Sequence, residues 1–323
     1  VGVMVGGVLQ LVMQFPFLRK VGARLRPNFH FNHPGIKKVG LLMLPAVFGA
    51  AVYQASIFIS TILASLLPEG SVSYLYYADR VVQLPLGVFA IAVGTASLPS
   101  FSDQVAGGDY RELKKTIAFS LRLILFVTIP AMVALIVLRV PIMSVLFQRG
   151  KFDTASTLLT AQALLYYTVG LWAFSCIRVI VSAFYALQDT KTPVKIAVAA
   201  LFINVIISIA LMFPMKHAGL ALATSIASAV NVVILVVILK KKVGVFLEKT
   251  FWTSIFKTVL ASGVMGLSIC VVNCLLGWNS EGAFGERLLF LIVAVIVGLT
   301  VFALTSYILG SSEMKALLRR KKG

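Results

Sequence analysis

Charged side chains are scarce in this 323-residue sequence. Asp, Glu, Lys and Arg make up 12% of it, whereas hydrophobic residues make up 59%. Soluble globular domains carry about 25% charged residues, so this composition excludes an ordinary soluble domain and indicates a membrane protein. The chain has 11 acidic and 29 basic residues, for a formal net charge of +18. Because long stretches carry no charge, the basic residues do not form the clustered surface of a nucleic-acid-binding protein, and we expect no nucleic acid partner.

The residue types that build metal and catalytic sites are also few. The three cysteines, Cys176, Cys270 and Cys274, lie in apolar stretches. Three cysteines cannot form a fully paired disulfide framework, and their surroundings do not suggest zinc ligation. The three histidines lie in predicted loops, apart from any cluster of carboxylates that would complete a metal site or an acid–base pair. We therefore expect neither an enzyme nor a bound cofactor or metal.

Long apolar stretches fill most of the chain. A membrane-spanning helix needs about 20 predominantly apolar residues. Residues 1–18 are expected to be the end of one such helix, and eight further segments are long enough to span completely. These eight segments are approximately 39–67, 72–100, 116–138, 155–187, 193–215, 218–239, 254–277 and 287–310. The sequence thus predicts an all-α fold, a polytopic helical bundle in a membrane.

The basic residues predict the orientation of this bundle. Alternate connections differ greatly in Lys and Arg: one set of segments holds twenty and the other holds five. Short cytoplasmic loops are enriched in Lys and Arg. The basic set, which we expect in the cytoplasm together with the C-terminus, comprises 19–38, 101–115, 188–195, 240–253 and 311–323.

The same features divide the chain into segments. The sequence begins inside an apolar stretch without a Met, so we expect it to be the C-terminal portion of a longer membrane protein. The expected segments are a helix end (1–18), a basic cytoplasmic loop (19–38), a six-helix lobe (39–239), a basic interfacial linker (240–253), a C-terminal helix pair (254–310) and a basic tail (311–323).

Four basic residues fall inside or at the margins of the predicted spans. Arg122 and Lys257 are close enough to the cytoplasmic ends of their helices for their side chains to reach the membrane surface. Arg80 and Arg178 lie deeper. An arginine at the centre of a span costs about 2.5–3.5 kcal/mol on insertion scales, so it normally faces a polar partner or a water-filled cavity. Asp79, next to Arg80, is the single carboxylate within the predicted spans.

Helical spacing places further polar residues near Arg80. Ser73 and Gln83 share its helix face, since seven and three residues return a helix to nearly the same side. The candidate substrate-binding residues are therefore Arg80, Asp79, Ser73, Gln83 and, with weaker support, Arg178. The alternative is that these residues form polar contacts that hold the bundle together. Asn204 and Ser208, four residues apart, are candidates for such contacts between helices.

Three stretches carry a resemblance to a known family. They are GSVSYLYYADRVVQLPLGVFAIAVGTASLPSFS at 70–102, LFQRGKFDTAST at 146–157 and FYALQDTKTPVK at 184–195. In this order, and with this number of helices, the chain resembles the MurJ/MviN lipid II flippases. That family belongs to the multidrug/oligosaccharidyl-lipid/polysaccharide exporter superfamily. The similarity extends from the first residue to about residue 242, and the last two spans fit the extra helix pair of the family.

The resemblance implies a fold and a function. It implies the C-terminal lobe of a two-lobe transporter, plus two extra helices, in the bacterial inner membrane. The implied partners are membrane lipids and lipid II, an undecaprenyl-pyrophosphate-linked peptidoglycan precursor carried from the cytoplasmic to the periplasmic leaflet. Arg80 corresponds to an arginine of the family's central cavity. Some members bind sodium through acidic residues, and the matching positions here are Ser60 and Ser208, with only Asn204 retained. A sodium site is therefore doubtful.

Two alternative functions remain at this point. One is another transporter of the superfamily, either a flippase for O-antigen-type lipid-linked oligosaccharides or a drug/cation antiporter, although an antiporter would be expected to contain more intramembrane carboxylates than Asp79 alone. The other is a non-transporting scaffold that recruits cell-wall synthesis proteins through its basic loops. Orientation in the membrane explains these loops more simply.

Overall fold

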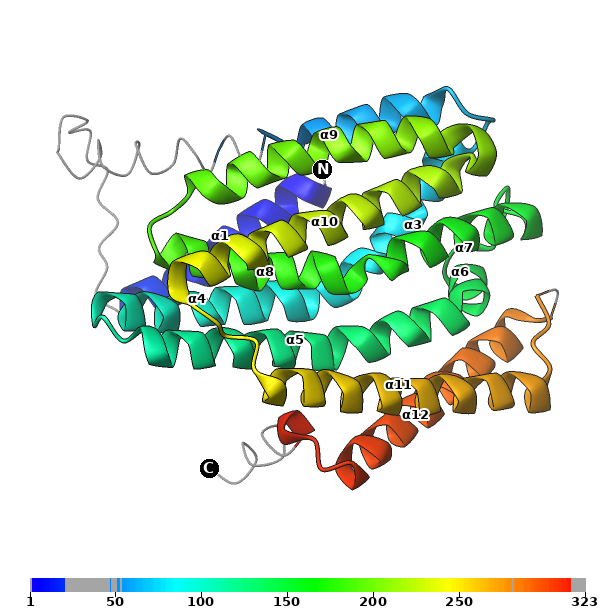
Figure 1. Cartoon of the computed structure of the whole chain (residues 1–323). Coiled ribbons are helices and arrows are strands. Elements are labelled where there is room, and N and C mark those ends of the chain that lie inside the picture. Colours follow the sequence, from blue (N-terminus) through cyan, green and yellow to red (C-terminus); the bar gives the residue numbers. More distant parts are fainter. Residues whose placement is uncertain (1, 21–46, 48–50, 53, 281, 315–323) are drawn as a thin grey trace. The chain divides into compact units, whose positions relative to one another are not determined.

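The chain is described by a computed structural model that covers residues 2–20, 47, 51–52, 54–280 and 282–314 (Figure 1). Its contacts divide it into two compact units, Val1–Leu44 and Pro45–Gly323. In the first unit, α1 (Gly2–Lys20) is a helix with Pro16 inside it. Its apolar part, Met4–Leu18, is shorter than a complete span. The predicted basic loop 19–38 lies almost wholly outside the described residues.

The second unit is a bundle of helices, and its described residues contain no strand. After a helical segment at Gln54–Ser65, the elements are α3 (Ser71–Pro85), the π-helix η1 (Leu86–Ala90), α4 (Ile91–Ala106), α5 (Tyr110–Val137), α6 (Arg139–Phe147), α7 (Thr154–Val169), α8 (Leu171–Ala186), α9 (Lys191–Met215), α10 (His217–Val243), α11 (Lys249–Leu276) and α12 (Phe284–Ile308). The predicted all-α bundle is therefore confirmed.

Among the described residues, six helices are long and apolar enough to cross a membrane, and α7 with α8 gives a seventh if this bent pair is one span. These spans correspond to seven of the eight that we predicted. The eighth, 39–67, lies partly outside the described residues. Two details differ from the prediction. Residues 155–187 form two helices inclined by 42°, and the connection 139–154 contains the short helix α6.

The bend between α7 and α8 has a local cause at Gly170. A Cβ atom at this glycine would lie 2.6 Å from the Ser225 Oγ and 2.8 Å from its Cα, so α10 packs directly against the backbone. The Ser225 hydroxyl donates a hydrogen bond to the Tyr166 carbonyl (2.6 Å). Breaks in membrane helices are tolerated where a neighbouring side chain binds the freed backbone groups. Ser225 has this role here.

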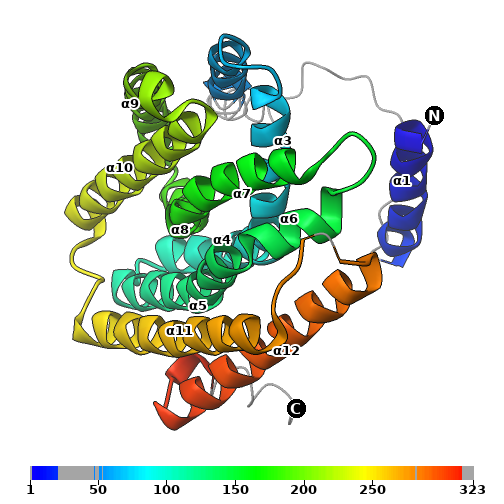
Figure 2. The same ribbon diagram turned by 90° about the vertical axis from the view of Figure 1, so that its right-hand side faces the viewer.

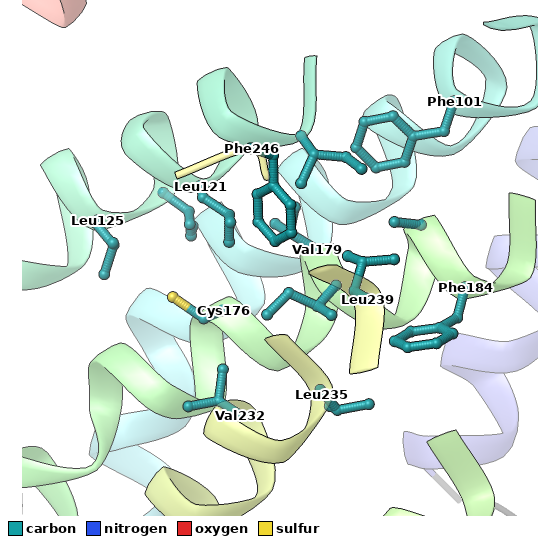
Figure 3. Packing of buried hydrophobic residues seen from close by; sticks show 14 of the residues in the cluster. Phe101, Leu121, Leu125, Cys176, Val179, Phe184, Val232, Leu235, Leu239 and Phe246 are labelled. Atoms are coloured by element: carbon teal, nitrogen blue, oxygen red, sulfur yellow. The ribbon is translucent and has the colours of Figure 1, made fainter. Parts of the chain in front are cut away.

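The main core lies where α4, α5, α8 and α10 meet, and Figure 3 shows its side chains pointing toward one another. Phe101, Val179 and Phe184 are fully buried there, and Leu239 joins them from α10. Two aromatic residues of the predicted interfacial linker also belong to this core. Phe246 is 3% exposed and Phe251 is 7% exposed, so they pack into the protein, whereas we had expected them at the lipid surface.

The C-terminal pair α11–α12 packs along α5 (Figure 2) through a cluster that includes Phe126, Met265 and Phe302. Polar contacts connect this pair to α6. The Arg287 guanidinium donates to the Ser144 hydroxyl at 3.0 Å. The side-chain amide of Gln148, just after α6, donates to the backbone carbonyl of Ser280, in the α11–α12 connection, at 3.2 Å.

The connections of the second unit alternate between its two ends, as the charge pattern requires. The α4–α5, α8–α9 and α10–α11 connections lie toward one end of the bundle, and the α3 start, the α6–α7 connection and the α9–α10 connection lie at the opposite end (Figure 1). The first set contains the basic segments 101–115, 188–195 and 240–253.

Candidate substrate site

The candidate site is built on α3, the first part of a span that continues through η1 into α4. Gly70, with φ +91°, precedes the helix, and the Ser71 hydroxyl donates to the Pro68 carbonyl at 2.6 Å. Pro85 ends α3 and has no N–H for the helical ladder, and the π-helix η1 follows it immediately. Short π-helical segments are frequent at functional sites. Here the segment follows the polar stretch of the span.

Opposite faces of α3 have different surroundings. Leu75, Ala78 and Val82 are buried and belong to the cluster that α3 shares with α7. Ser73 and Arg80 are exposed on the other side. Tyr76 is 53% exposed. The packing of the described residues of the second unit therefore leaves the polar face predicted around Arg80 exposed.

The side chains on this face contact one another. The Arg80 guanidinium carbon lies 4.7 Å from the centre of the Tyr76 ring, and Arg80 Nη1 lies 3.5 Å from the Gln83 side-chain oxygen. The nitrogen of the same Gln83 amide donates to the Asp79 carboxylate. Gln83 thus lies between the two charges. Asp79 and Arg80 are neighbours in sequence, but Asp79 and Gln83 are half-buried while Arg80 is exposed.

Arg178 is exposed on α8. Its backbone is closely packed: a Cβ at Gly94 of α4 would lie 3.4 Å from the Arg178 carbonyl oxygen. The Ser182 hydroxyl donates to the same carbonyl at 3.0 Å. Within the part of the chain that the structure describes, neither Arg80 nor Arg178 forms an ion pair. Both guanidinium groups therefore keep donors for a ligand.

The three positions matched to the family's sodium ligands carry no charge. Asn204 of α9 donates to the Thr224 hydroxyl of α10 at 3.2 Å, which agrees with the interpretation of a polar contact between helices. Ser208 is fully buried. Ser60 is half-buried on the Gln54–Ser65 segment. The sequence did not single out Thr224, because its hydroxyl is one of several small polar side chains on α10, with Ser225 and Ser228 next in the series. With no carboxylate among them, these residues do not fit a sodium site of the acidic type.

Metal-ligating side chains are not clustered in the described part of the chain. In the described ranges, no group of three or more His, Cys, Asp or Glu side chains could hold a metal ion. Cys176 is buried, and Cys270 and Cys274 are exposed and free.

One of the marginal charges has a partner that the sequence did not reveal. Arg122 was expected to be close enough to the membrane surface for its side chain to reach it. Its Nε lies 3.5 Å from the Glu313 carboxylate, which is 1% exposed. The sequence did not show this pairing because Glu313, nearly two hundred residues later, returns to α5 only in the folded chain.

The polar face of α3 is suited to binding an anion. A guanidinium can donate two parallel hydrogen bonds to a phosphate group, and the interaction is stronger in a low-dielectric surrounding. The Asp79 carboxylate is held by the Gln83 amide. The chain therefore offers an exposed cation on a membrane-spanning helix, next to an exposed aromatic ring.

Comparison with known protein families gives a match to a single description. The family model for lipid II flippase MurJ matches residues 1–306. Among curated proteins, a probable lipid II flippase MurJ of Buchnera aphidicola is 36% identical over 308 residues, covering 95% of this chain and 60% of the relative. The corresponding protein of Vibrio cholerae is 34% identical, covering 96% of this chain and 59% of the relative. The chain thus spans about three fifths of the length of these relatives.

Solved structures agree with this match. A structure described as lipid II flippase MurJ in an inward closed conformation has a TM-score of 0.70 and 27% identity, covering 92% of this chain and 59% of that chain. An outward-facing multidrug resistance transporter of the MATE family has a TM-score of 0.54 and 16% identity, covering 82% of this chain and 63% of that chain. The second likeness concerns the fold alone.

Proposed function

Because this chain belongs to the lipid II flippase MurJ family, we propose that it takes part in moving lipid II from the cytoplasmic to the periplasmic leaflet of the bacterial inner membrane. The relatives that it matches are named as probable lipid II flippases. The substrate is an undecaprenyl-linked pyrophosphate that carries the peptidoglycan precursor. Residues 39–239 would supply one lobe of the transporter, residues 254–310 the extra helix pair, and residues 311–323 a cytoplasmic tail.

The observation that carries the proposal is the exposed, unpaired guanidinium of Arg80 on a membrane-spanning helix. Charged residues inside spans are costly and normally face a partner or an aqueous cavity. Among the described residues Arg80 forms no ion pair, and its side chain is exposed in the second unit. A pyrophosphate would satisfy its donors and compensate for the cost of placing an arginine in the membrane.

The other residues of this face would have supporting roles. Gln83 binds Asp79, so the carboxylate competes less for the donors of Arg80. Ser73, two turns before Arg80, adds a hydroxyl to the same face. Arg178 on α8 would be a second cationic contact for the headgroup. Ser60, Asn204 and Ser208 take no part in this proposal as ion ligands.

Arg80 variants of the full-length protein test the proposal. Arg80→Ala should abolish the appearance of lipid II in the outer leaflet while the protein remains in the membrane at normal abundance. Arg80→Lys should retain only part of the activity, because a point charge replaces a two-donor fork. Arg111→Ala, which removes an exposed arginine at the start of α5, is the matched control and should remain active.

Abundance and flipping must both be measured in each variant. A structural role for Arg80 would instead lower the amount of protein in the membrane. Normal flipping by a normally abundant Arg80→Ala protein would refute the assignment of Arg80 to the substrate site.

A further inference from the structure

The aromatic ring of Tyr76 packs against the cation that the proposed function assigns to the substrate. Tyr76 precedes Arg80 by one helical turn, a spacing at which side chains on a helix meet. The guanidinium carbon lies 4.7 Å from the ring centre, within the range of about 6 Å at which a cation is attracted to an aromatic face. The long, flexible arginine side chain therefore has a flat surface on which to rest.

The ring of Tyr76 packs against a second aromatic ring. The rings of Tyr76 and Tyr77 meet edge to face, with centres 5.7 Å apart and planes inclined by 76°. The centre of the Tyr77 ring in turn lies 4.7 Å from the ring centre of Phe147 in α6 and 5.5 Å from that of Phe152. Aromatic pairs at these separations stabilise one another beyond the effect of their buried area. This chain of rings connects the support of Arg80 to α6 and to the α6–α7 connection.

Gln83 makes a second contact that restricts the orientation of the Arg80 guanidinium. Nη1 of Arg80 lies 3.5 Å from the Gln83 oxygen, one turn further along the helix. Arginine loses considerable rotamer freedom when its side chain is fixed. Contacts that already orient the side chain before a ligand binds reduce this cost at the moment of binding.

We propose that Tyr76 is a positioning residue for Arg80, whose ring holds the guanidinium in the orientation that receives an anionic pyrophosphate. This inference rests on the proposed role of Arg80 and adds to it a residue that acts through Arg80. The aromatic ring carries the effect. The Tyr76 hydroxyl is not needed for it, because the attraction arises from the ring face.

Binding of undecaprenyl pyrophosphate to the purified full-length protein is the appropriate measurement, because this probe has the pyrophosphate but neither sugar nor peptide. Tyr76→Leu should weaken binding about two- to fivefold, the size expected for a cation–aromatic contact at an exposed site. Tyr76→Phe keeps the ring and should bind like the unmodified protein. Tyr307→Leu, at an exposed tyrosine of α12, is the matched control and should leave binding unchanged.

A double-mutant cycle separates positioning from a general structural effect. In an Arg80→Ala background, Tyr76→Leu should have no further effect on binding, because residues that act together give non-additive changes. The same fold-loss in both backgrounds would overturn the proposal, as would equal losses for Tyr76→Phe and Tyr76→Leu. If Arg80→Ala itself bound the probe normally, the proposed function of Arg80 would fail, and this outcome is distinct from an additive cycle.

Discussion

Arg122 in α5 forms an ion pair with Glu313, with 3.5 Å between Arg122 Nε and a carboxylate oxygen of Glu313. Gly310, with φ +63°, ends α12 and allows the chain to turn sharply. The hydroxyls of Ser311 and Ser312 each donate to the Glu313 carboxylate at 3.0 Å. The pair joins the end of the C-terminal helix pair to the lobe, as Arg287 and Ser144 do near the beginning of α12.

Replacing Glu313 by Gln should destabilise the protein. The change removes the carboxylate and leaves the half-buried Arg122 without its partner, and an unsatisfied buried polar group costs about 1–3 kcal/mol. We expect a lower midpoint of thermal unfolding for purified protein in detergent. Glu286→Gln, at an exposed glutamate in the first turn of α12, should leave the midpoint unchanged.

The pH dependence provides a separate test of the Glu313 carboxylate. Burial raises the pKa of Glu313, but hydrogen bonds from its own backbone amide and from the side chains of Ser254, Ser311 and Ser312 outweigh this effect, so its pKa lies below the usual 4.5. The stabilisation is therefore present above the unfolded-state pKa and is lost as the pH falls through the folded-state pKa. The unmodified and Glu313→Gln proteins should approach equal stability in acid. A constant difference down to low pH would contradict this account.

The helix break at Gly170 should not tolerate a side chain. In Gly170→Ala, the new Cβ would lie 2.8 Å from the Ser225 Cα, a backbone atom that cannot move aside by rotation. Overpacking of this kind costs about 1–3 kcal/mol. We expect a lower thermal midpoint and reduced membrane abundance.

Gly263→Ala is the matched control for this prediction. Gly263 lies inside α11, and a Cβ there would meet nothing within 4 Å. Alanine is preferred to glycine in a helix interior by about 1 kcal/mol, so this variant should be as stable as the unmodified protein or more stable. Equal losses for the two alanine variants would show that close packing at Gly170 is not the reason.

The orientation in the membrane can be tested with single cysteines at Arg111 and Lys151. Both residues are exposed. Arg111 lies in the first turn of α5, and Lys151 lies in the α6–α7 connection. Neither has a positive φ, unlike the nearby Gly108 and Gly150, so a cysteine fits the backbone at both sites. The three native cysteines are first replaced by serine, because Cys270 and Cys274 are exposed. In intact cells whose outer membrane is permeable to the reagent, an impermeant thiol reagent should then label Lys151→Cys and not Arg111→Cys, because the Arg111 segment carries the cytoplasmic charge excess. Labelling of Arg111→Cys alone would mean an inverted topology.

The sequence by itself determined that the chain forms helices and that its connections alternate between two ends of the bundle. Uninterrupted apolar stretches in the second unit required helices such as α5 and α12, because a membrane interior cannot satisfy unpaired backbone groups. The uneven distribution of Lys and Arg predicted which connections share one end. The polar face of α3 was also readable, since Ser73, Arg80 and Gln83 repeat at helical spacing.

Only the tertiary structure decided which polar groups meet. Glu313 reaches Arg122 across most of the chain, and Ser225 fills the break at Gly170. Neither pairing leaves a periodic pattern in sequence. Phe246 and Phe251 could equally face lipid or protein, because both surroundings are apolar and the sequence does not distinguish them. Composition and periodicity therefore specify what each helix is, whereas the packing of distant helices specifies which contacts hold Arg122 and leave Arg80 exposed among the described residues.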